Sequence, residues 1–328
     1  MFLLTLEQAA TLLLFIVLGY LLRKINVLKD GAQVTLSALL VNFFSPFYSM
    51  ETLSKQVTVD RVVEFAIYLL AGILVTLVLI FIGIFFAKIF AKDRLHQNIL
   101  KYAFGFGNIG YFGYPVVGAV FGELAKANMM MFCLPMTIAI YTYGFVILTE
   151  RVEGGVAFKK ERSTAEKLKF LYSAPFLGMI AGIVLGLLPI EIPSFIDNIF
   201  KIGGSGYSVT AMLLTGVVLA KIPFFKLFTS IKPYLIGVVR LLVIPLIVMA
   251  LFLLLNLCGL SGQTFKDVAM ISIVTAAMPV GMNVVVFPEA NGIDGTEGSK
   301  MCFLSYVLAL GALPLMFELM LKVIENFA

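Results

Sequence analysis

The chain has 328 residues, of which 61% are hydrophobic and 13% are charged, and its mean hydropathy is +1.04. This composition excludes a soluble globular domain and indicates a protein with many membrane-spanning segments. The formal net charge of +5 is then a signal of membrane topology, and no nucleic-acid partner is expected.

Ten runs of the chain carry no charged residue. They cover residues 8–22, 31–50, 65–87, 102–122, 127–149, 170–190, 202–220, 241–265, 268–288 and 301–317. Most of these runs reach the roughly 20 residues that an α-helix needs to cross about 30 Å of hydrocarbon. The expected fold is therefore an all-α membrane protein with ten transmembrane helices.

The Lys and Arg residues between these runs set the expected orientation. An outside N-terminus puts seventeen of them in cytoplasmic connections and five on the other side, while Lys201 and Arg240 fall in or beside predicted spans. Because basic residues accumulate on the cytoplasmic side, we expect a multi-pass protein of the cell (plasma or inner) membrane with both termini extracytoplasmic. Residues 1–22 lack a basic start and a small-residue cleavage site, so they are expected to form the first span rather than a cleaved signal.

The charged stretch 150–169 divides the chain into two halves of five spans each. Residues 1–149 form the first five-helix repeat, 150–169 a cytoplasmic loop, and 170–328 the second repeat. Because each half has an odd number of spans, the second half enters the membrane in the opposite sense, which makes the repeats inverted. Met131-Phe132-Cys133-Leu134 and Met301-Cys302-Phe303-Leu304 are weak echoes of such a repeat.

The fourth run of each half is interrupted by helix-breaking residues. Residues 105–115 hold four glycines, an asparagine and a proline, and residues 276–283 hold Pro279, Gly281 and Asn283. A glycine inside a helix costs roughly 1 kcal/mol against alanine and a proline roughly 3 kcal/mol. Paired interruptions at corresponding positions of two repeats indicate a transporter site at the membrane midplane.

The interruptions predict the site residues. Pro115 and Pro279 each suit the first turn of a second half-helix, whose free N–H groups carry partial positive charge and attract an anion. The predicted substrate-binding set is Asn108, Gly110, Gly113, Pro115, Pro279, Val280, Gly281, Asn283 and Asn42. The alternative for Asn108 and Asn283 is structural, because an asparagine also caps exposed backbone or bonds a neighbouring helix. For Asn42, a kinked and packed helix before Pro46 explains the residue equally well.

Arg240 is a candidate charge partner for the substrate. An arginine within a span is expensive unless it is paired or faces water, and the alternative is an interfacial arginine that snorkels to lipid phosphate. Ser205 to Thr210 either line the cavity or, as Gly and Ser permit, allow tight helix packing.

The segments Gly107-Asn108-Ile109-Gly110-Tyr111-Phe112-Gly113-Tyr114-Pro115 and Pro279-Val280-Gly281-Met282-Asn283 resemble the auxin efflux carrier family, in particular its short bacterial members, which are similar to carriers of malonate and malate. The resemblance covers essentially the whole chain. It implies spans four and nine crossing at Pro115 and Pro279, an elevator-like movement, and a fold similar to bile-acid symporters and sodium/proton antiporters. Position 109 is Ile, where the family often has a hydroxyl residue.

The remaining polar residues predict neither a metal site nor catalysis. All six aspartates fall in loops or at span ends, His96 lies in a basic connection as a solvated residue, and three cysteines lack zinc spacing, so neither cofactor nor metal is expected.

The predicted function is a secondary transporter for a small organic anion, such as a mono- or dicarboxylate. A cation or proton antiporter on the same fold is the alternative, and an intramembrane enzyme or receptor is a third class. The expected partners are the anion and the lipid bilayer, and the sequence leaves a homodimer open.

Overall fold

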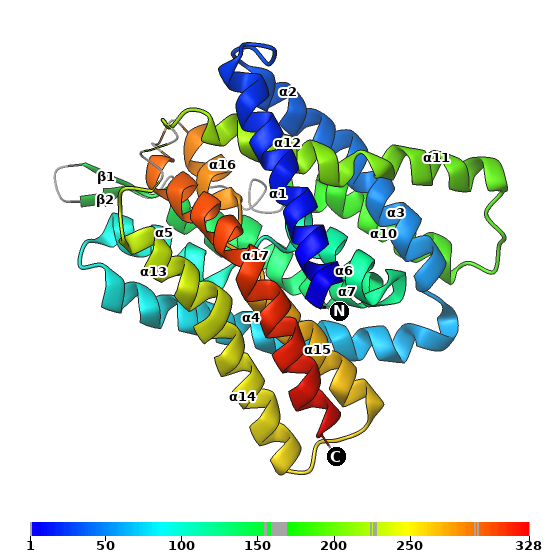
Figure 1. The fold of residues 1–328 in the computed structure, drawn as a ribbon. Coiled ribbons are helices and arrows are strands. Elements are labelled where there is room, and N and C mark those ends of the chain that lie inside the picture. The colour runs from blue at the N-terminus through cyan, green and yellow to red at the C-terminus, as the bar shows by residue number, and fades with distance from the viewer. Residues whose placement is uncertain are drawn as a thin grey trace.

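The computed structural model describes residues 2–153, 156–158, 169–223, 225, 228–291, 293 and 295–327, and these are almost entirely helical (Figure 1). The α-helices are α1 (Phe2–Lys24), α2 (Ala32–Leu39), α3 (Ser45–Gln56), α4 (Val62–Phe90), α5 (Arg94–Gly105), α6 (Tyr114–Phe121), α7 (Glu123–Ala139), α8 (Phe145–Leu148), α10 (Ala174–Leu187), α11 (Ser194–Ser205), α12 (Tyr207–Leu219), α13 (Lys232–Val238), α14 (Ile244–Leu257), α15 (Gln263–Ala277), α16 (Asn283–Ala290) and α17 (Thr296–Glu325). Four π turns, η1 (Leu40–Phe44), η3 (Ile109–Gly113), η4 (Ile140–Gly144) and η7 (Val239–Val243), and two 3₁₀ turns, η2 (Val59–Arg61) and η5 (Lys169–Tyr172), connect some of them.

The predicted loop 150–169 begins with a short hairpin that the sequence did not suggest. Strand β1 (Arg151–Glu153) pairs antiparallel with β2 (Val156–Phe158). Residues 154–155 and 159–168 of this loop, and with them Lys159, Lys160, Arg162 and Lys167, lie outside the described residues.

Six of the predicted spans fall on helical stretches that are long and apolar enough to cross a membrane. These stretches are Phe2–Lys24, Val59–Phe90, Glu123–Leu148, Ser194–Leu219, Lys232–Leu257 and Thr296–Glu325. The other four runs also fall on helices, but α10 is short, α3 carries charges, and the fourth run of each half is interrupted. The all-α membrane class is therefore confirmed for the part of the chain that the structure describes.

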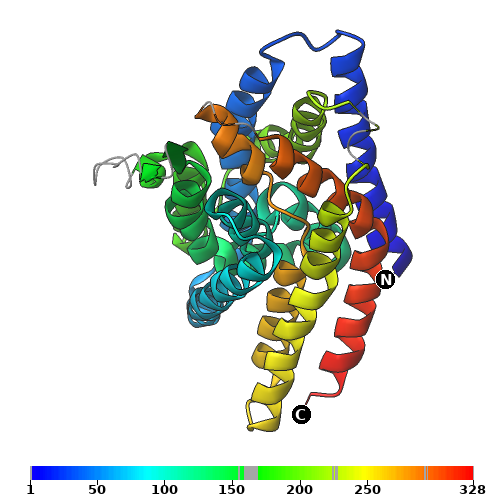
Figure 2. The same cartoon turned by 90° about the vertical axis from the view of Figure 1, so that its left-hand side faces the viewer.

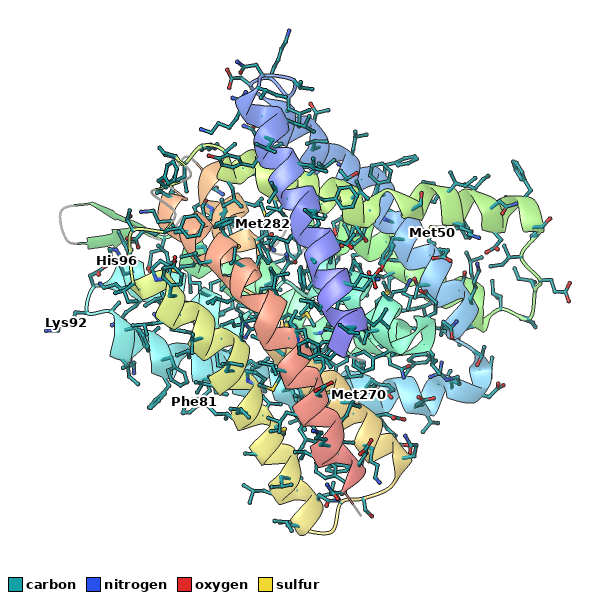
Figure 3. The ribbon with its side chains drawn as sticks, in the orientation of Figure 1. Met50, Phe81, Lys92, His96, Met270 and Met282 are labelled. Atoms are coloured by element: carbon teal, nitrogen blue, oxygen red, sulfur yellow. The ribbon has the colours of Figure 1, made fainter. Side chains whose placement is uncertain are left out.

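Helix α4 shows why this surface belongs in lipid. Its buried face includes Tyr68, Val75 and Leu79, whereas Leu74 and Phe81 on the opposite side are 65% and 71% exposed. Phe81 points outward from the edge of the molecule in Figure 3. A helix that is apolar on both faces is stable only if the outer face meets hydrocarbon, so α4 lies at the lipid boundary.

The helices form two groups. We call α1, α2, α3, α10, α11 and α12 the flanking bundle, in which α1 packs on α12 and α3 packs on α10 and α11. The remaining helices, α4 to α8 and α13 to α17, form the crossing bundle, in which α4 packs on α5 and α7, and α13 and α14 pack on α17 and α15. Figure 1 shows α11 at the right and α12 across the top, with α13 at the left and α14 at the bottom, and Figure 2 shows α14, α15 and α17 descending together.

Glycines bring α10 directly against the backbone of α3. Gly178, Gly182 and Gly186 recur every fourth residue, and a Cβ built on Gly178 would lie 2.8 Å from the Pro46 Cβ. Within a membrane, small residues let helices approach until their backbones touch, which supplies the van der Waals contact that drives association there. Gly203 and Gly204 make the same kind of approach to Phe47 and Tyr48, and Gly206 does so to the Phe44 ring. The segment Ser205 to Thr210 therefore contributes tight packing through Gly206, and it also lines a cavity through Tyr207.

Three of the four π turns in the described residues end two residues before a proline. These prolines are Pro46, Pro115 and Pro245. Proline has no N–H and its ring collides with the carbonyl one turn earlier, so a wider turn accommodates the lost hydrogen bond without ending the helix. Such turns recur at functional sites.

His96 joins the connection between α4 and α5 to the start of α17. Asp93 caps α5 by accepting a hydrogen bond from the His96 backbone N–H at 2.9 Å, and its carboxylate also contacts the ring Nδ1 at 2.8 Å. The other ring nitrogen lies 3.0 Å from Glu297 Oε2. His96 is therefore half-exposed, as predicted for a solvated residue, but it is also paired with two carboxylates.

The α3–α10 contact predicts a size limit at Gly178. We expect Gly178→Leu to lower the thermal midpoint of the detergent-purified protein by several degrees, because forcing a side chain into a filled contact costs about 1–3 kcal/mol. Gly311→Leu is the matched control, since nothing lies within 4 Å of a Cβ at Gly311. Equal midpoints for the two variants would show that the α3–α10 contact is not close.

The His96 contacts predict a pH-dependent stability. Its hydrogen bond to Asp93, together with the charge of Glu297, raises the His96 pKa above the ordinary value of 6.5. The folded state therefore holds the proton more tightly than the unfolded state, so this stabilisation is complete below pH 6.5 and is lost as the pH rises through the folded pKa. Thermal midpoints measured across that window should fall for the wild type and show a smaller slope for His96→Asn; an unchanged slope would contradict the pairing.

Candidate functional site

The first interruption separates α5 from η3. Helix α5 ends at Gly105, Phe106 is extended with φ −124° and ψ 118°, and Asn108 is the residue that caps η3. The turn η3 continues directly into α6. The second half-helix therefore begins with the π turn at Ile109, and Pro115 lies in the first turn of its α-helical part, α6.

The second interruption separates α15 from α16. Helix α15 ends at Ala277, and Met278 is extended with φ −63° and ψ 143°, as expected for a residue that precedes a proline. Helix α16 begins only at Asn283. The expectation that Pro279 occupies its first turn is therefore wrong: Pro279 lies in the connection, where its carbonyl serves as a hydrogen-bond acceptor.

The two interruptions lie side by side and complete each other's hydrogen bonds. Gly107 and Val280 form an antiparallel bridge. The Asn108 N–H donates to the Pro279 carbonyl at 2.7 Å, and the Gly281 N–H donates to the Phe106 carbonyl at 3.1 Å. We call Phe106–Asn108 and Met278–Gly281 the junction. Met282, which follows it directly, lies near the centre of the molecule (Figure 3).

Glycines lie at the tight contacts of both strands of the junction. A Cβ on Gly281 would lie 3.1 Å from the Gly107 carbonyl oxygen and 3.2 Å from that of Phe106. A Cβ on Gly107 would overlap the Arg240 guanidinium. The close approach of the two backbones therefore depends on these glycines.

Helix α17 holds the remaining polar groups of Val280. The Ser305 hydroxyl accepts from the Val280 N–H at 3.0 Å and donates to the Cys302 carbonyl at 2.7 Å. The Cys302 thiol donates to the Val280 carbonyl at 3.4 Å. Sequence reasoning missed Ser305 and treated Cys302 only as a small apolar residue, because nothing local to α17 shows which backbone these groups meet.

Asn108 has the structural role that the sequence left open. Its Oδ1 accepts from the Tyr111 N–H at 3.1 Å, which caps the second half-helix, and its Nδ2 donates to the Tyr306 hydroxyl at 2.6 Å. Asn283 is half-buried at the first position of α16, and its side chain is paired with the Tyr102 hydroxyl. Both amides also line a cavity, so capping and ligand contact are compatible here.

This cavity lies between the junction and the flanking bundle. Its wall combines residues of η1, α3, α10 and α12 with Gly107–Tyr111, Tyr141 and Gly281–Asn283 of the crossing bundle. The cavity volume is about 100 Å³, whereas one water needs roughly 10–15 Å³ on the same measure. The space therefore fits a small solute of several heavy atoms.

Tyrosines dominate the polar part of the cavity wall. The six that line it are Tyr48, Tyr102, Tyr111, Tyr114, Tyr141 and Tyr207. Tyr48 stacks on Tyr207 with ring centroids 4.5 Å apart, and Tyr111 of the crossing bundle lies 6.0 Å from Tyr207. None of the described residues that line the cavity is charged. The sequence signal for this wall was the presence of tyrosines within apolar runs, but it does not say which of them converge.

The structure brings only part of the predicted site to the cavity. Asn108, Gly110, Gly281 and Asn283 line it. Four other predicted residues, Gly113, Pro115, Pro279 and Val280, shape the interrupted segments behind the wall without lining it.

Asn42 does not belong to this cavity. Its Nδ2 donates to the Ala38 carbonyl one turn earlier in the same helical segment, at 3.0 Å, and the side chain is exposed. It faces a separate cavity beside Leu214 and Lys221. The structure therefore does not support the proposed site role and agrees with the local, helix-kink explanation.

Arg240 lies behind the junction and is fully buried, with 0% exposure. Its Nε donates to the Met278 carbonyl at 2.9 Å and its Nη1 donates to the Phe104 carbonyl at 2.8 Å. The alternative of an interfacial arginine that snorkels to lipid phosphate is therefore wrong. Arg240 does not line the cavity; it bridges the C-terminal ends of α5 and α15 instead.

The sequence is similar to that of membrane transport proteins over nearly its full length. A family described as "Membrane transport protein" matches residues 4–317. A protein named "Uncharacterized transporter" from Methanothermobacter thermautotrophicus is 24% identical over 314 residues, which cover 94% of this chain and 96% of the relative. An uncharacterized transporter from Methanocaldococcus jannaschii is 25% identical over 293 residues, which cover 86% of this chain and 88% of the relative. Because the match includes both interrupted segments and nearly all the rest of the chain, this protein belongs to the membrane transport protein family of auxin efflux carrier-like transporters.

Proposed function

We propose that the protein is a secondary carrier for a small organic anion, such as a mono- or dicarboxylate, and that the anion binds in the cavity beside the junction. The observation that carries the proposal is that the N-terminal ends of two half-helices, η3 with α6 and α16, begin at cavity-lining asparagines. The aligned peptide dipoles leave partial positive charge at such ends, which favours an anion. Family membership and the names of the relatives support a transporter and are consistent with a protein that is not an enzyme.

Direct ligands for a carboxylate come from neutral groups in this proposal. Asn108 and Asn283 supply amide N–H groups, and tyrosine hydroxyls supply further donors. The asparagine amides are already oriented, since Asn108 is fixed by Tyr111 and Tyr306. Preorganised donors lower the cost of ordering on binding.

The packing pattern supports two inverted repeats of five spans, residues 1–149 and 170–328. The first span of each half packs on the second span of the other, as α1 does on α12 and α10 on α3. Within each half the third span packs on the fourth and the fifth, as α4 does on α5 and α7, and α13 with α14 on α15 and α17. A multi-pass arrangement of ten spans in the cell membrane, with both termini extracytoplasmic, is the topology we propose from this pattern and the basic residues.

The position of the cavity supports alternating access by an elevator-like movement. Its wall is shared by the flanking bundle and the crossing bundle, so a displacement of one against the other would change the side from which the anion is reached. Where the bundles meet, the contacts include Tyr111 against Tyr207 and the Lys126 ammonium 4.6 Å from the centre of the Tyr48 ring.

The cation or proton antiporter receives less support than the anion carrier. Cation and proton pathways within membranes usually contain a carboxylate, and the described residues that line the cavity include no Asp or Glu. No group of His, Cys, Asp and Glu able to hold a metal occurs among the described residues. These observations favour the anion.

The first test is a ligand screen on the purified protein. A ligand that binds only the folded state stabilises it by about 2.7 kcal/mol at a concentration 100 times its Kd. We therefore expect malonate, malate or a related carboxylate to raise the thermal midpoint in a saturable way, with sulfate and chloride at equal ionic strength as controls. A complete absence of response across mono- and dicarboxylates would refute the anion carrier.

The second test removes the amide donors. We expect Asn108→Ala and Asn283→Ala to weaken binding of the stabilising carboxylate about 10- to 100-fold, since a hydrogen bond to a charged group contributes about 1.5–3 kcal/mol. Proteoliposome uptake of the labelled carboxylate should fall in parallel.

The control for this test is Asn42→Ala, which changes the same type of side chain outside the cavity. Midpoints without ligand monitor the fold, because Asn108→Ala also removes a helix cap. Wild-type uptake by both cavity variants, or an equal loss in Asn42→Ala, would show that the anion does not bind at these amides.

A further inference from the structure

Arg240 is a buried cation whose hydrogen-bond partners are backbone carbonyls rather than a carboxylate. Its two bonded nitrogens meet backbone carbonyls, and no carboxylate contacts it among the described residues. Its third nitrogen, Nη2, is buried against Gly107 without a hydrogen-bond partner in that same part of the chain. A buried charge is expensive unless something of opposite sign faces it, so the carbonyl ends must supply that sign.

The two carbonyls belong to the ends of the two first half-helices. Phe104 is in the last turn of α5, and Met278 follows the last residue of α15. The C-terminal end of a helix carries roughly half a negative elementary charge. Two such ends meeting at one point therefore present roughly one negative charge, which one guanidinium balances.

A place of this kind is also where a metal cation can bind. In carriers built from interrupted helices, exposed carbonyls and half-helix C-terminal ends coordinate the sodium ion or proton that drives transport. In this protein the guanidinium occupies two of those carbonyls permanently. Its side chain enters from η7, and the missing Cβ of Gly107 leaves it room.

We infer that Arg240 is a resident cation that takes the place of a coupled metal cation at the junction, so that the carrier moves its anion without sodium. This inference rests on the proposed function, which it extends from the substrate to the driving ion. Arg240 acts as a positioning residue, since it holds the two half-helix ends together from behind the cavity and does not touch the substrate.

The experiment compares cations at constant ionic strength on the purified protein. Thermal midpoints are measured in choline, potassium and sodium chloride for the wild type, Arg240→Lys and Arg240→Met. We expect the same midpoint in all three salts for the wild type and for Arg240→Lys, which keeps the charge. For Arg240→Met we expect a midpoint lower by several degrees in choline and a saturable recovery in sodium or potassium, because the freed carbonyls then attract a small cation.

Each outcome bears on the inference. Sodium-specific stabilisation of the wild type would overturn it, and so would an Arg240→Met protein that folds but ignores all three cations, since that result assigns Arg240 a packing role only. If Arg240→Met does not fold, uptake of labelled malonate by wild-type proteoliposomes decides: uptake that is unchanged by an imposed sodium gradient supports the inference, and uptake that depends on the gradient overturns it.

The result is distinguishable from a failure of the proposed function. Stabilisation by carboxylates only when sodium is present would keep the anion carrier and overturn the resident cation. Indifference to every carboxylate together with a cation response confined to Arg240→Met would refute the carrier and keep the role of Arg240.

Discussion

The structure depends on one constraint, which is that backbone groups in hydrocarbon must find hydrogen bonds inside the protein. An unpaired N–H or carbonyl there costs several kcal/mol. Each interruption supplies what the other lacks, because Asn108 and Gly281 donate to carbonyls of the opposite segment, while Ser305 and Cys302 satisfy Val280. One interrupted helix alone would leave these groups unpaired, so the two interruptions stabilise each other. The same pairing leaves η3 and α16 starting at the wall of a cavity, and in this way a requirement of folding also produces a candidate binding site.

The junction separates helix ends by sign. The N-terminal ends of η3 and α16 begin at amides that line a cavity without charged residues among those described, and the C-terminal ends of α5 and α15 face the Arg240 guanidinium. Since each end carries roughly half an elementary charge, the arrangement offers positive potential on one side and a neutralised negative end on the other. Placing the guanidinium in the cavity itself would bind an anion more tightly but would also hinder its release. Neutral donors and helix ends bind an anion with lower affinity, which suits a carrier that must release its substrate.

The sequence predicted the features that are local in the chain. Long apolar runs identified the six helical stretches that are long enough to cross a membrane, and glycines and prolines at 105–115 and 276–283 identified the interruptions, because their conformational costs do not depend on distant partners. The sequence predicted less well those features that depend on tertiary contacts.

Pro279 was predicted at the start of a helix, but its carbonyl accepts a hydrogen bond from Asn108 and the helix begins later, at Asn283. Asn42, like Asn108, is an asparagine in an apolar run that contains a proline. Its helix is not interrupted, however, and its side-chain amide donates to a carbonyl of the preceding turn. Tyr48 and Tyr207 come from segments far apart in the sequence, and no pattern within either segment indicates that their rings stack over the cavity. Three π turns also shift the helical register just before a proline, so a fixed helical period misplaces the residues around them.

The occupation of the junction by the Arg240 guanidinium in place of a metal cation has a consequence for the direction of transport. Moving one negative charge out of a cell that is negative inside releases about 2.3 kcal/mol per 100 mV of membrane potential, so export of an anion needs no coupled ion. Import of the same anion opposes the potential and requires a further source of energy, such as a cation that travels with the anion. A sodium ion at the junction would supply that charge and leave with the substrate, whereas the guanidinium of Arg240 is covalently attached and returns with the protein. A carrier of this design therefore draws the energy for export from the membrane potential alone, whereas concentrative import needs a coupled proton or an exchanged anion in place of sodium.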